Sequence, residues 1–580
     1  MKDKSRFLGS TLAAFKHVSV AAFAAIVLLA APVASNAQET TTAVRGVVTT
    51  PAGAPAAAQS VTITDTRTGA TRATTTNDSG VFSIRGLPVG GPYTIVVQSS
   101  QYQDARVTDV YTNLSAAASF NIALGAADQA IEEIVVTAKL VAVQQLAVGP
   151  GSAFSIDDIE AMPSIARQIR DVIRIDPRVS LSRADNGAGS GINCLGGNSR
   201  SNAFTIDGAV ANDGFGLNEG TGTSARFAFP IPYDTIASTS VEFAPIDVQY
   251  SQFTGCAINI VTKPGSNEFH GSAFYLYNEK GLTGTTLNGR TVINDPFEDK
   301  NFGFDFSGPI IKDKLFFTVA YEETDEGGVQ NSGPIGGGFA NEDWLTVAEA
   351  EEIAGVLLNQ YGRDVGPIVR NLPQTSERWF ARFDWNINDN HRAEFTYTML
   401  DELNLDPDDL GFGGFTFKDN FEFEGIDQET MSLRLFSNWT DRLSTEFRYS
   451  NFDVVDIQGP AGGGEAQDAN PITRIEVGDI FTSGPGFFRS ANDLKYTIDQ
   501  IKLSADYVLG DHTLTVGVEQ ESRDIFNLFI PDATGTITFD DTAALIAGTA
   551  NGIVMNGSYT QVAADAAAAF KRDINSFYLQ

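Results

Sequence analysis

Three residues have the types that zinc peptidases use to hold their metal ion. His391 and Glu394 form an HxxE pattern, and His512 follows later in the chain. Residues three apart on a strand point to opposite faces, however, and both residues belong to a predicted hairpin around residues 388–390. The pattern therefore predicts no metal site, and we expect neither a cofactor nor enzyme activity.

Cys194 and Cys256 are the two cysteines of the chain and are candidates for a disulfide. In an oxidising compartment this bond would close a span of 62 residues and remove roughly 4 kcal/mol of unfolded-chain entropy. Two buried free thiols are the alternative. Two cysteines also exclude a zinc or iron–sulfur site built from four.

Acidic residues dominate the charge of the chain. With 39 Lys and Arg against 72 Asp and Glu, the formal net charge is −33, which would repel the phosphates of a nucleic acid. We therefore expect no nucleic-acid partner. An acidic run in a predicted loop is either a solvated surface or a divalent-cation site, and it contains Asp401, Glu402, Asp406, Asp408 and Asp409.

The N-terminus has the order of an export signal. Basic residues precede an apolar stretch over residues 18–31, and small residues follow at 34–37. This order predicts a signal peptide over residues 1–37. The apolar stretch is too short for a membrane-spanning helix, which needs roughly 20 residues. A membrane location would therefore require a β-barrel, which also satisfies its own backbone hydrogen bonds in lipid.

Residues 40–125 have the pattern of a small β-sandwich. Short alternating segments, such as 60–65 and 93–100, are separated by turns rich in Gly, Asn and Pro. A linker over residues 126–149 follows. It contains an extended apolar septet that could add a strand to the sheet edge of another protein. The septet consists of Glu132, Glu133, Ile134, Val135, Val136, Thr137 and Ala138.

Residues 150–265 predict a compact α+β unit. Helical spacing covers residues 154–162 and 164–173, and extended segments follow, the last at 255–263.

Residues 266–580 alternate between apolar and polar side chains with the period of a strand. Trp379, Phe383 and Trp385 share one face, while Arg382 and Asp384 share the other. One face therefore suits lipid and the other suits water. After residues 388–390 the apolar set resumes with Ala393, Phe395, Tyr397 and Met399.

Short and long connections alternate between the predicted strands. The short turns lie around residues 312–314, 388–390, 441–442 and 510–512. The long links cover about 279–300, 324–376, 401–429, 452–495 and 524–571. Short periplasmic turns and long extracellular loops are typical of outer-membrane barrels. A soluble sandwich or propeller would explain the alternation but not this regular difference, so we predict an antiparallel transmembrane β-barrel.

Several segments resemble known families. The order of Gly46, Asp78, Gly80, Gly86, Leu87, Pro88, Gly90 and Tyr93 resembles the carboxypeptidase regulatory-like domain, a prealbumin-like β-sandwich. The septet, the sequence DIEAMP and the run YSQFTGCAINIVTKPGSNEFHG resemble the TonB box, plug and plug-to-barrel junction of TonB-dependent outer-membrane receptors of the Oar-like type. The resemblance implies a mainly β fold. It comprises the sandwich, an α+β plug domain over residues 150–265 and part of a transmembrane barrel over residues 266–580.

The number of strands is small for a plugged barrel. We predict ten strands, and ten strands close into a tube about 20 Å across, whereas 22 strands give about 44 Å. A plug of this length has a radius of gyration near 13 Å and needs the wider tube. We therefore expect the chain to be an N-terminal portion of a longer receptor, with about ten of an expected 22 strands.

The resemblance also implies a function. The TonB C-terminal domain would bind the septet, and the TonB–ExbB–ExbD complex would supply the work that moves the plug in its barrel within outer-membrane lipid. An extracellular ligand of unknown identity would bind to plug loops near residues 212–222 and to the long outer loops. An adhesion or surface-assembly protein without transport is the alternative, and an exported metallopeptidase is a third possibility.

Overall fold

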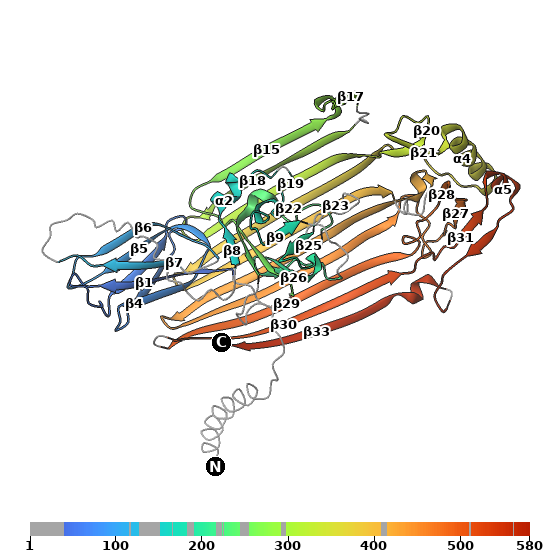
Figure 1. Ribbon diagram of the computed structural model, residues 1–580. Helices are drawn as coiled ribbons and strands as arrows, with labels where there is room; N and C mark the ends of the chain where they lie inside the picture. Colours follow the sequence, from blue (N-terminus) through green and yellow to red (C-terminus); the bar gives the residue numbers. More distant parts are fainter. Residues whose placement is uncertain are drawn as a thin grey trace, which may run out of the picture.

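The computed structural model describes residues 40–114, 118–126, 151–164, 166–181, 191–215, 223, 225–243, 254–291, 297–407, 414–509, 512–560 and 562–580. These residues form a β-sandwich, a small α+β unit over residues 151–262 and a long antiparallel sheet, with a cap at one end of the sheet (Figure 1). We call the α+β unit the plug, after the domain predicted there. The predicted signal peptide and the septet lie outside the described residues.

The sandwich consists of two sheets with the strand orders β4-β1-β7 and β3-β2-β5-β6. Alternate residues point inward and form one buried core, which includes Val44, Ile63, Tyr93, Ile95 and Phe120. The strands are β1 (Thr42–Thr49), β2 (Ser60–Asp65), β3 (Thr71–Thr75), β4 (Val81–Leu87), β5 (Gly90–Gln98), β6 (Ala105–Thr112) and β7 (Ala118–Ala123).

The plug contains a five-stranded mixed sheet with the order β12-β11-β14-β13-β8 and a small hairpin of β9 and β10. All residues of the central strand β14 are buried, because it lies between β11 and β13 and both of its faces are covered. The elements are β8 (Gly151–Phe154), α2 (Ile156–Ala161), α3 (Arg170–Ile173), β9 (Val179–Leu181), β10 (Ile192–Cys194), β11 (Ala203–Ile206), β12 (Ala209–Val210), β13 (Ile236–Glu242) and β14 (Ala257–Thr262).

Both plug helices are shorter than the sequence spacing predicted. Helix α2 begins after Ser155, which forms a capping box with Asp158. The predicted helix over residues 164–173 is reduced to α3, because Arg167 has a left-handed backbone with φ of 50° that an α-helix does not accommodate. Its side chain instead reaches Glu322 of the long sheet.

No helix among the described residues has the length and apolar character needed to cross a membrane.

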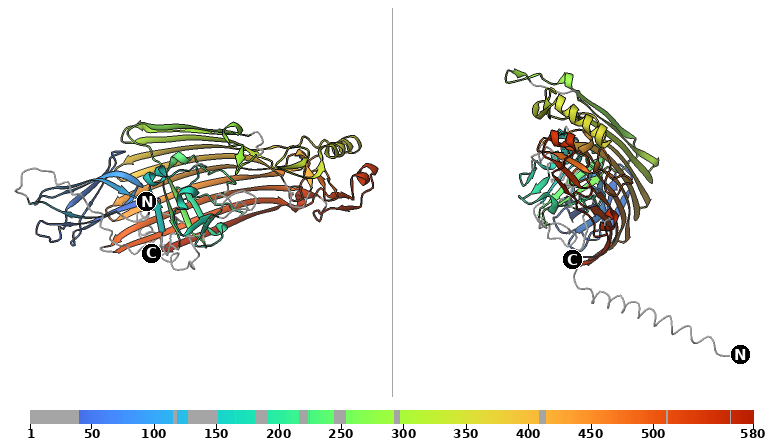
Figure 2. Two further views of the ribbon diagram at one scale, coloured as in Figure 1. Left: turned by 45° about the horizontal axis from the view of Figure 1, so that its top comes forward. Right: turned by 90° about the vertical axis from the view of Figure 1, so that its right-hand side faces the viewer.

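Ten strands pair in sequence order to form one antiparallel sheet, which curves around the plug (Figure 2). They are the ten strands that the alternation predicted. Among the described residues, the outermost strands β15 and β33 each pair with one neighbour. The strands are β15 (His270–Glu279), β18 (Glu298–Ile311), β19 (Leu315–Val329), β22 (Asn371–Asn388), β23 (His391–Pro407), β25 (Phe421–Thr440), β26 (Leu443–Pro460), β29 (Asn492–Leu509), β30 (His512–Phe529) and β33 (Ala568–Leu579).

The two faces of this sheet have the chemical difference that the sequence predicted. Trp379, Phe383 and Trp385 are exposed on the outer face of β22, whereas Arg382 points to the plug and is 2% exposed. Leu433 on β25 is likewise exposed on the outer face. Apolar residues outside and charged residues inside are the pattern of an outer-membrane barrel wall.

The strands extend further into the long links than the alternation predicted. Strand β23 continues to Pro407 and β25 begins at Phe421, so most of the predicted 401–429 loop is strand. Outward positions here carry exposed Asp401, Asp427 and Glu429 instead of apolar side chains. The strands therefore continue to pair beyond the apolar band of the outer face. In this part of the sheet the sequence no longer alternates between apolar and polar residues, so it does not reveal the strands.

The long links fold together into a cap at the end of the sheet opposite the sandwich (Figure 1). Four of them contribute residues to one apolar core, which includes Leu357, Phe415, Val477, Phe481 and Leu545. The cap contains α4 (Val347–Tyr361), α5 (Thr542–Ala547) and a sheet of β24 (Phe415–Thr416), β28 (Phe481–Ser483), β27 (Arg474–Val477), β31 (Thr536–Phe539) and β32 (Gly552–Val554). Smaller pairs in the links are β16 (Thr286–Leu287) with β17 (Arg290–Thr291) and β20 (Ser332–Ile335) with β21 (Asn341–Thr346).

Candidate functional site: the interface between plug and sheet

A row of charged side chains crosses the inner face of the ten-stranded sheet. Each member lies opposite the next on the neighbouring strand, so the charges are concentrated at one level. Apart from Asp384, every member is less than 5% exposed. We call this set the charged row, and it consists of Asp384, Glu394, Arg434, Arg448, Lys502 and Glu519.

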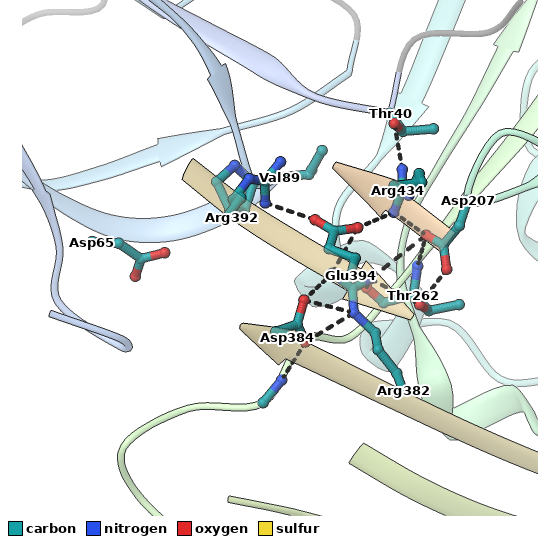
Figure 3. A network of polar contacts seen from close by, with 12 residues as sticks. Thr40, Asp65, Val89, Asp207, Thr262, Arg382, Asp384, Arg392, Glu394 and Arg434 are labelled. Carbon is teal, nitrogen blue, oxygen red and sulfur yellow. Dashed lines mark hydrogen bonds and ion pairs between the residues drawn. The ribbon is translucent and has the colours of Figure 1, made fainter. Parts of the chain in front are cut away.

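The plug reaches the charged row through the turn between β11 and β12. The Asp207 carboxylate accepts hydrogen bonds from the hydroxyl of Thr262 at 2.6 Å and from its backbone N–H at 3.1 Å. It also lies 3.6 Å from the guanidinium groups of Arg382 and Arg434 (Figure 3). A Cβ at Gly208 would lie 2.2 Å from Arg448 Nη1, so the turn needs glycine to approach the sheet this closely.

Glu394 joins three arginines of the sheet. Its carboxylate lies 2.7 Å from Arg392 Nη1 and 3.4 Å from Arg382 Nη2, and it accepts a short hydrogen bond from Arg434 Nη2. Arg434 Nη1 also donates to the hydroxyl of Thr40 at 2.5 Å, immediately before the sandwich. The network in Figure 3 therefore connects the sandwich, the plug and the sheet.

A second ion-pair cluster lies around Glu322 on β19. Arg167 of the plug places Nε 2.9 Å from Glu322 Oε1 and Nη2 2.6 Å from Asp234. Glu322 also accepts the backbone N–H of Tyr233 at 3.0 Å and lies 3.3 Å from Arg378. Glu322 is fully buried, so these contacts replace its hydration.

A third cluster lies nearer the cap. The backbone N–H groups of plug residues 226–228 donate hydrogen bonds to the Glu402 carboxylate. The bond from the Ala228 N–H is 3.0 Å long. The Arg226 side chain lies 2.6 Å from Asp456 and 3.3 Å from Glu424. Glu402 is therefore fully buried against the plug.

This position corrects the interpretation of the acidic run as a loop that is solvated or binds cations. Asp401, Glu402 and Asp406 belong to β23, and the inward position of Glu402 turns it to the plug. Asp408 and Asp409 lie outside the described residues.

The HxxE residues do not converge. The His391 ring packs against Trp439 with 5.1 Å between ring centroids, while Glu394 is held by arginines on the inner face. Among the described residues, no group of three His, Cys, Asp or Glu side chains is placed to hold a metal ion. Glu394 pairs only with arginines of the sheet, and two of them, Arg382 and Arg434, also face Asp207 of the plug.

Cys194 and Cys256 are joined by a disulfide in the plug core. The bond links the end of β10 to the residue before β14, and the two Cα atoms are 5.9 Å apart. The predicted ligand-binding segment 212–222 is described only as far as Phe215, which is 38% exposed. Beside it, the Gly214 N–H donates to the Tyr496 hydroxyl of the sheet at 3.3 Å.

Sequence reasoning did not identify the ion-pair residues that join the plug to the sheet. Arg382, Glu394 and Arg434 occupy inward strand positions, which the alternation assigned to water. A charged residue at an inward position was therefore the feature of the sequence that could have identified these ion-pair residues. Arg167 and Asp207 carried no comparable signal, because they lie in irregular segments of the plug.

Two segments match described families. Residues 43–125 match the carboxypeptidase regulatory-like domain, and residues 261–333 match an outer membrane β-barrel domain. The first segment coincides with the sandwich, and the second covers the plug-to-sheet junction and the first strands of the sheet.

Proteins similar to this chain include two curated relatives and one solved structure. The TonB-dependent transporter Oar of Myxococcus xanthus is 33% identical over 138 residues, which are 23% of this chain and 12% of the relative. The probable TonB-dependent siderophore receptor PirA of Acinetobacter baumannii is 25% identical over 281 residues, 47% of this chain and 35% of the relative. The chain thus spans well under half of either relative in the matched parts. The outer membrane transporter YddB of Escherichia coli has a similar fold, with a TM-score of 0.51 at 13% identity over 74% of this chain and 54% of that chain.

Proposed function

Because this chain is an Oar-like TonB-dependent receptor of the outer membrane, we propose that it binds an extracellular ligand and imports it into the periplasm. The outer membrane has no ATP supply and no sustained ion gradient. The work that moves the plug must therefore come from the inner membrane, and we assign it to the TonB–ExbB–ExbD complex.

The observation that supports this proposal is the way the plug is held. Three clusters of buried ion pairs, around Asp207, Glu322 and Glu402, join it to the inner face of the sheet. Removing one partner of a buried ion pair costs about 3–5 kcal/mol, because the remaining charge is left without compensation. A partial displacement that leaves one of these charges buried alone is therefore costly, whereas a mechanical pull that admits water to both partners can release the plug.

We propose residues 132–138 as the segment that receives this pull. They lie between β7 of the sandwich and β8 of the plug, so a force on them acts directly on the plug. The TonB C-terminal domain would pair with this segment as an added strand, in which backbone hydrogen bonds supply affinity. The ligand would bind to plug loops near residues 212–222 and to the long outer loops.

Deletion of residues 132–138 tests the proposal. The purified receptor should bind the TonB C-terminal domain in a surface plasmon resonance experiment, and the deletion should abolish this binding. In cells, uptake should be lost across a panel of ferric siderophores, cobalamin, peptides and glycans, while ligand binding at the cell surface remains. Deletion of residues 140–146 from the same linker is the control for linker length. Unchanged uptake after the first deletion would favour the adhesion protein instead.

A further inference from the structure

A cavity of about 250 Å³ lies between the sandwich and the short-turn end of the sheet. The sandwich contributes Thr68, Arg72 and Tyr93 to its wall, and the sheet contributes Asn388 and Arg392. This volume is slightly below the range of sites for drug-sized ligands, about 300–1,000 Å³, so it suits a small molecule or a head group.

Direct contacts hold the sandwich at this end of the sheet. The backbone N–H of Asn267 donates to the carbonyl of Arg67 at 2.8 Å. The guanidinium of Arg85 donates to the hydroxyl of Thr513 at 3.4 Å. The cavity therefore belongs to a formed interface between two parts of the chain.

Two arginine nitrogens in this wall are buried without a hydrogen-bond partner. They are Nη1 of Arg72, on strand β3, and Nε of Arg392, on strand β23. Arg392 is 8% exposed, and its Nη1 is bonded to Glu394 at 2.7 Å. Burial and the positive charge of Arg392 lower the pKa of Arg72 to about 10, and the carboxylate of Asp389 acts against this change.

Most acidic groups in the wall already have partners. Asp65 lies 2.8 Å from Arg67, and Asp384 lies 2.7 Å from Arg382. Glu394 is shared by three arginines. Asp313 accepts a hydrogen bond from the Asn267 side chain at 2.7 Å. Asp389, the other acidic group of the wall, is exposed. Among the buried side-chain atoms of the described wall residues, those without a partner are therefore donors, and they suit an oxyanion.

We propose that this cavity binds a phosphate group between Arg72 and Arg392, and that the bound phosphate fixes the sandwich to the short-turn end of the barrel. Guanidinium groups bind phosphate through charge-assisted hydrogen bonds, and a tetrahedral oxyanion can accept from donors on opposite walls. The group can come from free phosphate or from the head group of a phospholipid in the periplasmic leaflet. The inference concerns the docking of the sandwich and does not depend on transport.

Calorimetric titration of the full receptor in detergent with inorganic phosphate tests this site. We expect saturable binding with one site per chain, at least tenfold weaker in R72Q and unchanged in R106Q. Arg106 lies on the exposed face of β6 and does not line the cavity, so R106Q removes the same charge elsewhere on the sandwich. Absence of saturable binding, or equal binding by R72Q, would overturn the proposal.

A second measurement tests the effect on docking. Phosphate should slow hydrogen exchange of the Asn267 amide, which donates across the interface, in the wild type and R106Q but not in R72Q. Unchanged exchange in the wild type at saturating phosphate would overturn the docking role. Dihexanoyl phosphatidylglycerol distinguishes the source: displacement of phosphate by this lipid assigns the site to a head group, and failure to displace assigns it to the free anion.

Discussion

The plug and the cap both lie against the ten-stranded sheet, but different forces hold them. The plug meets the sheet through buried ion pairs, such as those of Asp207 and Arg167, in addition to apolar contacts such as the cluster of Val210 with strands of the sheet. The cap is formed by apolar side chains from four links, among them Phe415 and Phe481. An ion pair loses little when water replaces its partner, whereas an apolar core is stable only while water is excluded. The comparison indicates that the plug is built for release into water and the cap for remaining folded.

The largest predicted effect is the loss of Glu394, which would sharpen this contrast. E394A leaves Arg382, Arg392 and Arg434 without their shared carboxylate on the sheet. Because Arg382 and Arg434 are also the sheet partners of Asp207, we expect plug docking to weaken by about 5 kcal/mol. Hydrogen exchange of β14 should accelerate accordingly, while exchange in the cap should not change. E429A is the matched control, because Glu429 is exposed on the outer face of β25. If β14 exchanged as slowly in E394A as in the wild type, the network would not be what holds the plug.

The disulfide sets how far a released plug can unfold. We expect the double variant C194S/C256S to destabilise the plug by about 4 kcal/mol, because the bond closes a 62-residue span of the unfolded chain. Denaturant unfolding followed by hydrogen exchange in β13 and β14 measures this loss. Reduction of the wild type should reproduce the effect and should not affect the double variant. If C194S/C256S destabilised the cap by a similar free energy, the disulfide would not stabilise the plug alone, which would contradict this prediction.

The apolar character of the cap can be tested at Phe481. Its ring contacts Phe417 and Phe415, with centroids 6.0 and 6.4 Å away, and it is 1% exposed. We expect F481A to destabilise the cap by about 3–4 kcal/mol, because it removes a buried aromatic side chain. Protease cleavage within residues 461–491 should increase while plug exchange is unchanged. F488A, at a position 41% exposed in the same link, is the control.

The sequence predicted the structure best where the strand alternation of apolar and polar side chains extends over many residues. The ten strands and the inward position of Arg382 followed from alternation, because lipid and the lumen impose opposite demands on neighbouring residues. The ion pair between Arg434 and Asp207 could not be predicted, because it depends on how the plug docks and not on local spacing.

The cap was partly visible in the sequence. Helix α4 begins with a capping box between Thr346 and Glu349 and ends at Gly362, which are ordinary local signals. They lie within a segment that lacks the alternation of a strand, and this lack predicts only a long loop. The association of four links in one core was not accessible, because short strands such as β24 have no period of their own.

The smallest predicted effect is the pH dependence of the cap. Burial raises the pKa of Asp419 from 3.8 to about 6, and that of Glu465 to about 7. The folded cap therefore keeps protons that the unfolded links release at pH near 4, so its stability is greatest at low pH and falls as the pH rises from about 4 to 7. For Asp419 the shift corresponds to about 2–3 kcal/mol. In D419N the side-chain oxygen can still accept from Ser483 and Gly484, so cap exchange should lose about half of this slope, because Glu465 keeps its raised pKa, whereas plug exchange should keep its own pH profile. A cap that becomes more stable between pH 4 and 7 would contradict the burial of these carboxyl groups.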